Sequence, residues 1–436
     1  MTLHSKVSIS HCGCDDSRHL EGILDVEHAI AIARSLVAPT GETESVPLET
    51  ACGRIAALDV HAPRPMPFFN LSAMDGFAVR LADLTGHGPW RLAVSATVAA
   101  GDVVSGVRRE EGSACRIYTG GPLPTGADAV VMNEDCTDEG AFVVISRRPQ
   151  SGENIRVKGG DIKQGALLVA AGTRIEPRHI GLMAANGLGT LDVFRRPRIA
   201  VFSTGRELLS QAAPEEGRVF DANRPLLITM AQDAGAEISD LGIVDDDLEA
   251  ASRFFASNAG GFDLLLSSGA VSAGGRDFIR PAFVGAGGTV RAWKVALKPG
   301  KPVLFGTLGR TAYFGLPGNP LAAYVGFELF VREQLLRLGG EKVQEPHERR
   351  AIAGYAVRRK TGRREYVPAR IVSWSPAGLP VVETLGKGSS GTLYALAQAD
   401  GLAVIAADWA QIEPGDPIGF RPFNPLRADR RDGELD

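Results

Sequence analysis

Strands and helices alternate along the sequence after Arg195, and this alternation restricts how that part of the chain can fold. The helical segments follow start signals: Asn223 with a proline close behind it, three successive aspartates, and a turn that ends at Pro320. The predicted strands are residues 199–202, 237–244, 262–266 and 313–315, and the predicted helices are residues 225–234, 248–258 and 320–338. The pattern predicts an α/β domain whose largely parallel sheet is doubly wound, with helices on both faces.

The flanking segments have a different character. Short strands between glycine-rich turns predict small β-rich domains within residues 75–175 and again within residues 345–425. A helix is expected after the N-cap Asp25. The first 19 residues and the last ten are polar and are expected to be disordered tails. The motif at residues 11–14, His-Cys-Gly-Cys, lacks the second ligand pair of a zinc site, so its role stays open.

Composition excludes several classes of protein. Lys+Arg 47 against Asp+Glu 51 gives a net charge of −4, which provides no bulk positive field for nucleic acid or an anionic membrane. Five cysteines among 436 residues do not form a disulfide framework, and no apolar run reaches the ~18 residues of a membrane span. A reduced, cytoplasmic compartment is therefore expected. Glycine, at 52 residues or about 12% against a usual ~7%, requires many tight turns or close approaches of the backbone to a ligand.

In an open parallel sheet, ligands bind beyond the carboxyl ends of the strands, so the loops at those ends are the candidate site. Their candidate residues are Ser203, Thr204, Gly205, Glu207, Asp246, Ser268, Gly269, Ser272, Asp277, Pro317, Gly318 and Asn319. Lys298 and Lys301 join them, because the chain has only nine lysines and three lie between residues 294 and 301.

These residue types suit a bound oxyanion. Glycine-serine loops before helices offer backbone N–H groups and hydroxyls, and lysines add positive charge. Carboxylates beside an oxyanion require a cation between them, so Asp246, Asp277 and Glu207 predict a Mg²⁺ site shared with phosphate. No GxxxxGK[ST] motif is present, which argues against a P-loop ATPase. The alternatives for single features stay open: the aspartates at 245–247 can simply cap a helix, and the lysines can be solvated.

Five motifs in order resemble the molybdopterin molybdenumtransferases, the family to which the gephyrin E domain belongs. They are Ser72-Ala73-Met74-Asp75-Gly76-Phe77-Ala78, residues 118–128, Phe202-Ser203-Thr204-Gly205, Lys298-Pro299-Gly300-Lys301-Pro302 and Gly315-Leu316-Pro317-Gly318-Asn319-Pro320. The resemblance covers about residues 20 to 425.

The resemblance implies an elongated homodimer of four-domain chains. The implied domains are residues 20–67 plus 161–194 (domain I, dimerisation), 68–160 (domain II, a small β domain), 195–340 (domain III, resembling a molybdopterin adenylyltransferase) and 345–425 (domain IV, a β domain), between tails 1–19 and 426–436. The implied activity is the transfer of molybdenum from molybdate into adenylylated molybdopterin, with a divalent metal and release of AMP. Implied partners are molybdopterin adenylyltransferase and molybdoenzyme acceptors or their chaperones.

The resemblance also assigns residues. Asp246 and Asp277 match acidic residues near the metal and phosphates, and Glu207 matches an acidic residue after the first strand of the α/β domain. Asp75 and Thr119 match loops that face the partner subunit's site. A site shared between subunits is therefore expected. Ser390 belongs to a glycine-serine loop that resembles one near the pterin substrate.

One loop departs from the family pattern, and two alternative functions stay open. Ala270 replaces a glycine in the loop that starts at Ser268, which would strain a backbone with positive φ. A paralogue that prefers tungstate or handles its metal differently remains an alternative, and a scaffold or anchoring protein of the same fold is another.

Overall fold

The computed structural model describes residues 8–9, 23–103, 109–209, 213–269, 278–342, 348–386 and 393–424. The chain divides into two units. One unit comprises Met1–Glu44, Gly53–Ile55 and Phe194–Asp436, and the other comprises Ser45–Cys52 and Ala56–Val193. No helix within the described ranges is long and apolar enough to cross a membrane.

The first unit contains the predicted α/β domain, and its fold class is confirmed. Its six-stranded sheet has the order β17 (Glu237–Val244), β14 (Arg198–Thr204), β18 (Leu264–Ser268), β22 (Thr311–Leu316), β21 (Pro302–Leu308) and β19 (Thr289–Lys294). The first four strands are parallel. Strand β21 is antiparallel to β22, and β19 is antiparallel to β21, so only β21 runs in the opposite direction. Neither β21 nor β19 was predicted.

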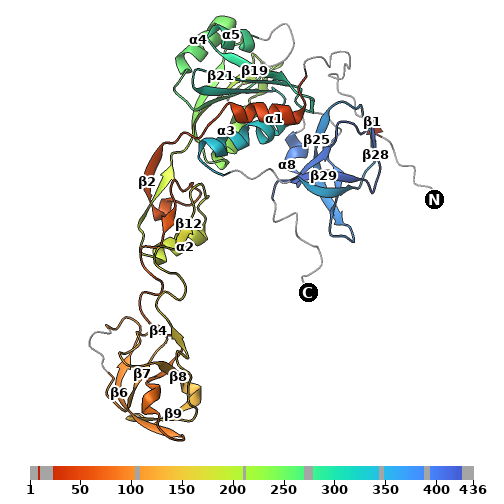
Figure 1. The fold of residues 1–436 in the computed structure, drawn as a ribbon. Coiled ribbons are helices and arrows are strands. Elements are labelled where there is room, and N and C mark those ends of the chain that lie inside the picture. Colours follow the sequence, from red (N-terminus) through yellow and green to blue (C-terminus); the bar gives the residue numbers. More distant parts are fainter. Residues whose placement is uncertain are drawn as a thin grey trace, which may run out of the picture. The chain divides into compact units, whose positions relative to one another are not determined.

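Helices cover both faces of this sheet. In β14, Ile199 and Val201 join one hydrophobic core while Ala200 and Phe202 join the other, as the two-residue period of a strand requires. The helices are α1 (Val26–Ser35), α3 (Asn223–Asp233), α4 (Leu248–Asn258), α5 (Ile279–Gly285), α6 (Pro320–Gly326), the π-helix η5 (Phe327–Val331) and α7 (Arg332–Leu338). Figure 1 shows α4 and α5 on one side of the sheet and α1 and α3 on the other.

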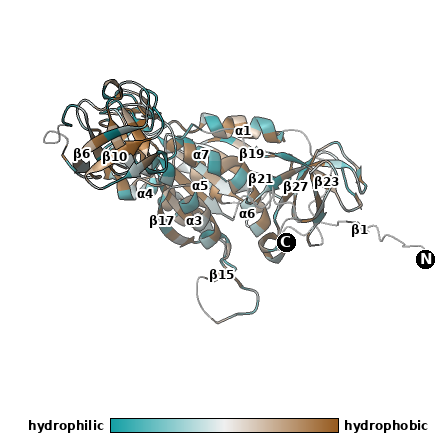
Figure 2. Cartoon of the chain, turned by 90° about the horizontal axis from the view of Figure 1, so that it is seen from below, coloured by the Kyte–Doolittle hydropathy of each residue, from teal (hydrophilic) through white to brown (hydrophobic). Residues whose placement is uncertain are grey.

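Helix α1 belongs to this domain although about 160 residues separate it from β14. The side chain of Asp25 caps its first turn by accepting from the backbone N–H of His28 (2.8 Å). Val26, Ala29 and Ala33 lie on one face and are buried in the α/β core. Figure 2 shows hydrophilic and hydrophobic residues side by side along this helix. The structure thus groups α1 with the α/β domain, whereas the predicted domain I included it.

The long predicted helix exists but is not uniform. The π-helical turn η5 stands between α6 and α7, and the helix ends at Gly339. Pro320 occupies its first turn, where the missing N–H has no intrahelical partner to lose.

The carboxyl-terminal β domain closes into a barrel. Its strands are β20 (Leu297–Lys298), β25 (Arg364–Trp374), β26 (Pro380–Thr384), β23 (Arg349–Ala353), β29 (Pro417–Pro422) and β27 (Gly401–Ile405), and an extra pairing of β25 with β27 closes the ring. The short elements beside it are α8 (Leu393–Ala397), β24 (Val357–Arg358), β28 (Gln411–Ile412) and β1 (Ser8–Ile9). Strand β1 pairs with the edge of β24 that β28 leaves free. Residues 1–19, which contain β1, were predicted to be a disordered tail, and the structure differs from that prediction at Ser8–Ile9.

The second unit contains the other β domain. Its six-stranded sheet has the order β8 (Ala129–Met132), β5 (Gly76–Val79), β7 (Ser113–Ile117), β6 (Trp90–Val98), β10 (Phe142–Ile145) and β9 (Cys136–Asp138). The remaining elements near or within this unit are β2 (Thr43–Pro47), β3 (Val60–His61), β4 (Leu71–Ser72), β11 (Ile155–Arg156), β12 (Leu167–Val169), β13 (Thr190–Phe194), α2 (Pro177–Ala185), and the 3₁₀ helices η1 (Leu48–Thr50), η2 (Leu81–Asp83) and η4 (Asn133–Asp135). Gly76 is required in β5, because a Cβ there would lie 1.9 Å from the carbonyl oxygen of Val131.

Candidate functional site

The carboxyl ends of the four parallel strands meet at one edge of the α/β sheet. Ser203 at the end of β14 lies in register with Ser268 at the end of β18, and Ser268 in turn lies beside Leu316 of β22. On the other side, Thr204 pairs with Val244 of β17. The loops singled out in the sequence therefore start side by side.

Three of these loops approach one another more closely than side chains allow. Gly269 has φ +99°, and a Cβ on it would lie 2.2 Å from the carbonyl oxygen of Thr204 and 2.8 Å from its hydroxyl. Gly318 also lies against Gly269, since a Cβ on Gly318 would lie 3.6 Å from the Cα of Gly269. The Thr204 hydroxyl is buried and makes no hydrogen bond to any described residue. The glycines thus let the backbones of three loops pack directly against one another around the buried hydroxyl of Thr204.

Asn223, which the sequence identified only as the start of a helix, connects these loops. Its amide nitrogen donates to the hydroxyl of Ser268 (2.6 Å) and to the carbonyl of Gly318 (2.8 Å). The hydroxyl of Ser268 in turn donates to the carbonyl of Pro317 (3.2 Å). Asp221, two residues before Asn223, accepts from the hydroxyl of Ser203 (3.1 Å). The sequence signal that could have identified Asp221 and Asn223 as site residues is their position between a strand and the first turn of a helix that contains a proline.

The predicted acidic residues lie at the same edge. One carboxylate oxygen of Asp246 accepts from the backbone N–H of Arg206 (3.1 Å), which ties the loop after β17 to the loop after β14. Glu207 is exposed, and its carboxylate folds back over Gly205, where a Cβ would lie 2.7 Å from it. Both carboxylates thus border the loop that follows Thr204.

The two predicted lysines differ in their surroundings. Lys298 forms an ion pair with Glu365 of the barrel (2.9 Å), and Glu365 also accepts from Arg359 (2.8 Å). Lys298 and Arg359 thus share one carboxylate, and the three side chains together keep one net positive charge. Lys301 is half-buried, and no ion pair or hydrogen bond of its ammonium group occurs within the described ranges.

Asp75 and Thr119 lie together in the second unit. One carboxylate oxygen of Asp75 accepts from both the backbone N–H (2.7 Å) and the hydroxyl (2.8 Å) of Thr119. These two hydrogen bonds lower the pKa of Asp75 from its usual 3.8, so the exposed carboxylate is charged at neutral pH. The two residues thus form one polar feature, and its place at the partner subunit's site stays a prediction.

Other predicted residues lie outside the described residues: Ser272 and Asp277 in the loop after β18, the departing Ala270 in the same loop, and Ser390 near the barrel. No cluster of three or more His, Cys, Asp or Glu side chains that could hold a metal occurs in the part of the chain that the structure describes. Of the three acidic residues predicted around Mg²⁺, Asp246 and Glu207 lie in the described part of the chain and Asp277 does not.

The fold and this edge define a multidomain protein built around a molybdopterin-binding type of domain. The family models that match are the MoeA N-terminal region (domain I and II) over residues 24–187, the probable molybdopterin binding domain over residues 200–337, and the MoeA C-terminal region (domain IV) over residues 350–423.

Curated relatives make the assignment specific. The chain is 32% identical to a protein of Haemophilus influenzae named molybdopterin molybdenumtransferase, over 88% of this chain and 95% of that relative. A protein of the same name from Nostoc sp. is 34% identical over 86% of this chain and 88% of its own length. The crystal structure of a molybdopterin biosynthesis MoeA protein from Pyrococcus horikoshii superimposes with a TM-score of 0.79 at 29% identity, covering 92% of this chain and 99% of that one. The chain belongs to the molybdopterin molybdenumtransferase family.

Proposed function

We propose that this chain is a molybdenum insertase, which transfers molybdenum from molybdate into adenylylated molybdopterin and releases AMP. The observation that carries the proposal is the meeting of Thr204, Gly269 and Gly318 at the edge of a molybdopterin-binding type of domain. Molybdate is a tetrahedral dianion and the adenylylated substrate carries a phosphoanhydride. Both need N–H and O–H donors and positive charge close to the backbone.

Each described residue of the site has a role under this proposal. The buried hydroxyl of Thr204 donates to an anionic group of the substrate, and the glycines let that group reach the backbone. Asn223 holds Ser268 and Gly318 at a fixed separation. Lys301 supplies the positive charge, whereas Lys298 on β20 is paired with Glu365 on the neighbouring strand β25.

The donor set at this edge fits Mg²⁺, which takes oxygen ligands and is bound in proteins by one or two carboxylates together with substrate phosphates. Asp246 and Asp277 would hold it. When bound, Mg²⁺ would neutralise charge on the phosphoanhydride as it is cleaved. Asp246 also keeps the loop after β14 in place through the N–H of Arg206, a role that needs no metal.

An insertion assay tests the function. We expect AMP and molybdenum-loaded cofactor when purified protein is mixed with adenylylated molybdopterin, labelled molybdate and Mg²⁺. In the same assay, an excess of tungstate is expected to compete with the labelled molybdate less well than an excess of unlabelled molybdate does. An AMP yield equal to that of a reaction without protein would contradict the proposal.

The proposal also includes a cytoplasmic homodimer with a site shared between its subunits. The dimer would receive its substrate from molybdopterin adenylyltransferase and deliver its product to molybdoenzymes or their chaperones.

If Asp75 and Thr119 of one subunit complete the other subunit's site, then dimers mixed from Asp75→Ala chains and Asp246→Ala chains regain one intact site. We expect each single variant to be nearly inactive and the mixture to recover up to a quarter of wild-type activity, because half of the dimers are mixed and each has one intact site. Failure of the mixture to exceed its parents, with mixed dimers verified by mass spectrometry, would contradict the shared site.

A further inference from the structure

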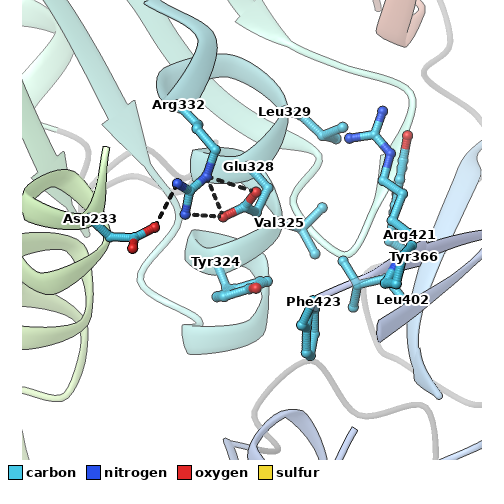
Figure 3. A pocket seen from close by; sticks show the side chains of 11 residues that line it. Asp233, Tyr324, Val325, Glu328, Leu329, Arg332, Tyr366, Leu402, Arg421 and Phe423 are labelled. Carbon is cyan, nitrogen blue, oxygen red and sulfur yellow. Dashed lines mark hydrogen bonds and ion pairs between the residues drawn. The ribbon is translucent and has the colours of Figure 1, made fainter. Parts of the chain in front are cut away.

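An apolar and a polar contact join the barrel to the α/β domain within the first unit. In the apolar contact, the ring of Tyr324 on α6 packs edge to face against Phe423, with 5.5 Å between the ring centroids (Figure 3). The polar contact involves β20, the strand that the α/β domain contributes to the barrel sheet. Lys298, one of the lysines predicted to bind an oxyanion, lies on β20, so this contact bears on the candidate site.

The backbone of the lysine loop, which comprises residues 294–301, is joined to the barrel. Strand β20 pairs in parallel with β25, so that Lys298 lies in register with Glu365. The backbone N–H of Arg364 donates to the carbonyl of Ala296 (3.0 Å). The barrel therefore fixes the backbone from which the Lys298 side chain extends.

The lysine loop also lies beside the site at the strand ends. A Cβ on Gly300 would lie 3.6 Å from the carbonyl oxygen of Ala322, which belongs to the first turn of α6. That turn directly follows Gly318 and Asn319 in the chain. The lysine loop therefore packs against the start of the helix that follows the candidate site.

The side chain of Lys298 is held by two further side chains. Its ammonium group forms an ion pair with one carboxylate oxygen of Glu365 (2.9 Å), and the other oxygen accepts from Nε of Arg359 (2.8 Å). The exposed fractions are 14% for Lys298, 9% for Glu365 and 2% for Arg359. Arg359 also donates to three backbone carbonyls, those of Arg363, Ala406 and Trp409. A carboxylate fixed in this way sets the position of the ammonium group and the directions of its three N–H donors.

The charges of these three side chains separate two roles for Glu365. Together they keep one net positive charge, which adds to that of Lys301. If only charge mattered, loss of the Glu365 carboxylate would raise the net charge to two and attract an oxyanion more strongly. If the carboxylate instead positions the ammonium group, its loss leaves Lys298 and Arg359 as two cations that repel each other, and the ammonium group moves from its place. The two roles predict opposite changes in oxyanion binding.

We propose that Glu365 is a positioning residue, which holds the Lys298 ammonium group where it binds the tetrahedral oxyanion, and that Arg359 keeps Glu365 in place. The near-burial of the three side chains favours this role, because a solvent-exposed ion pair fixes little geometry. The inference rests on the proposed function and deepens it, since molybdate is the oxyanion of that reaction.

Isothermal titration of the full-length protein with molybdate tests the inference. We expect Glu365→Gln to weaken molybdate binding about tenfold, although it adds a positive charge. Glu365→Asp keeps the negative charge on a side chain one methylene shorter, so we expect a smaller loss, about threefold. Lys298→Met should weaken binding at least tenfold. Adding Glu365→Gln to Lys298→Met should cause no further loss, because a positioning residue acts only through the residue that it positions.

Glu333→Gln is the matched control. The Glu333 side chain is also 9% exposed and lies close to two arginines, Arg34 (2.7 Å) and Arg337 (3.7 Å), but it belongs to α7, at the other end of the long helix. This variant should lose stability in thermal unfolding followed by circular dichroism, and it should bind molybdate as the wild type does. The same measurement shows whether Glu365→Gln is folded, and if it is not, Glu365→Asp decides the question.

Unchanged or tighter binding of molybdate to the folded Glu365 variants would overturn the inference. Equal losses from Glu365→Gln with and without Lys298→Met would also overturn it, because Glu365 would then act independently of Lys298. The KM for molybdate in the insertion assay should rise in the same order as the titrations give. Insertion without this order contradicts the inference alone, and molybdate binding in this order without insertion contradicts the proposed function alone. A wild-type protein that neither binds molybdate nor inserts molybdenum contradicts both.

Discussion

Replacing Gly269 by alanine is expected to abolish most molybdenum insertion, with a fall in rate of roughly 100-fold. The added Cβ would lie 2.2 Å from the carbonyl oxygen of Thr204, so the ends of β14 and β18 must move apart. The backbone at φ +99° adds strain of about 1–2 kcal/mol for any L-residue, which we expect as a loss in the free energy of unfolding. Insertion assays together with urea unfolding measure both effects.

Gly260→Ala is the matched control for this experiment. Gly260 also has positive φ (+77°), but a Cβ there meets nothing within 4 Å. Gly260→Ala should therefore show the stability loss that comes from backbone strain alone and keep its activity. If both variants lose activity equally, backbone strain alone explains the result, and the close approach of Gly269 to Thr204 has no special role in the reaction.

The second large effect is expected from Asp246→Asn. The amide oxygen can still accept from the N–H of Arg206, so the loop keeps its shape while the negative charge is lost. If Asp246 holds the divalent metal, insertion should slow by roughly 100- to 1,000-fold, which is typical for loss of one charged group at a reacting centre. The rate should be measured across a range of Mg²⁺ concentrations, because partial recovery at high Mg²⁺ is expected of a weakened ligand.

Asp245→Asn provides the comparison, since it removes a carboxylate of the same loop that is exposed. We expect it to retain most of the activity. A loss in Asp245→Asn as large as that in Asp246→Asn would show that general negative charge in this loop matters, and it would argue against a metal ligand at position 246.

The helices and strands of the α/β domain were predictable where a capping residue marks the boundary of a segment with buried apolar residues. Strand β17 and helix α4 have the predicted bounds, because Asp247 caps the helix through the N–H of Ala250 and separates the two elements. Strands β19 and β21 were missed since their signal is not local. Gly306 in β21 is required by the neighbouring strand, where a Cβ would lie 2.4 Å from the carbonyl of Thr289.

The site shows the same division between local and long-range information. The loops at the strand ends followed from the parallel topology, and their register in the structure agrees with that expectation. The hydrogen bonds of Asn223 to Ser268 and Gly318 join residues 45 and 95 positions apart, and sequence spacing gives no hint of them. Likewise, nothing near Lys298 in the sequence indicates that it will pair with Glu365. The roles assigned to the site residues and the domain boundaries stay predictions.

The division of the chain into two units has a consequence for synthesis on the ribosome. The unit that contains residues 56–193 is complete before most of the α/β domain has been made, whereas α1 is made first and needs strands and helices that come after Phe194. At translation rates of about 5–20 residues per second, the buried face of α1 waits for roughly ten seconds or longer before its partners exist. During that time Val26, Ala29 and Ala33 are exposed to solvent or to a chaperone. The amino-terminal helix is therefore a point at which nascent-chain binding factors can influence the yield of folded protein.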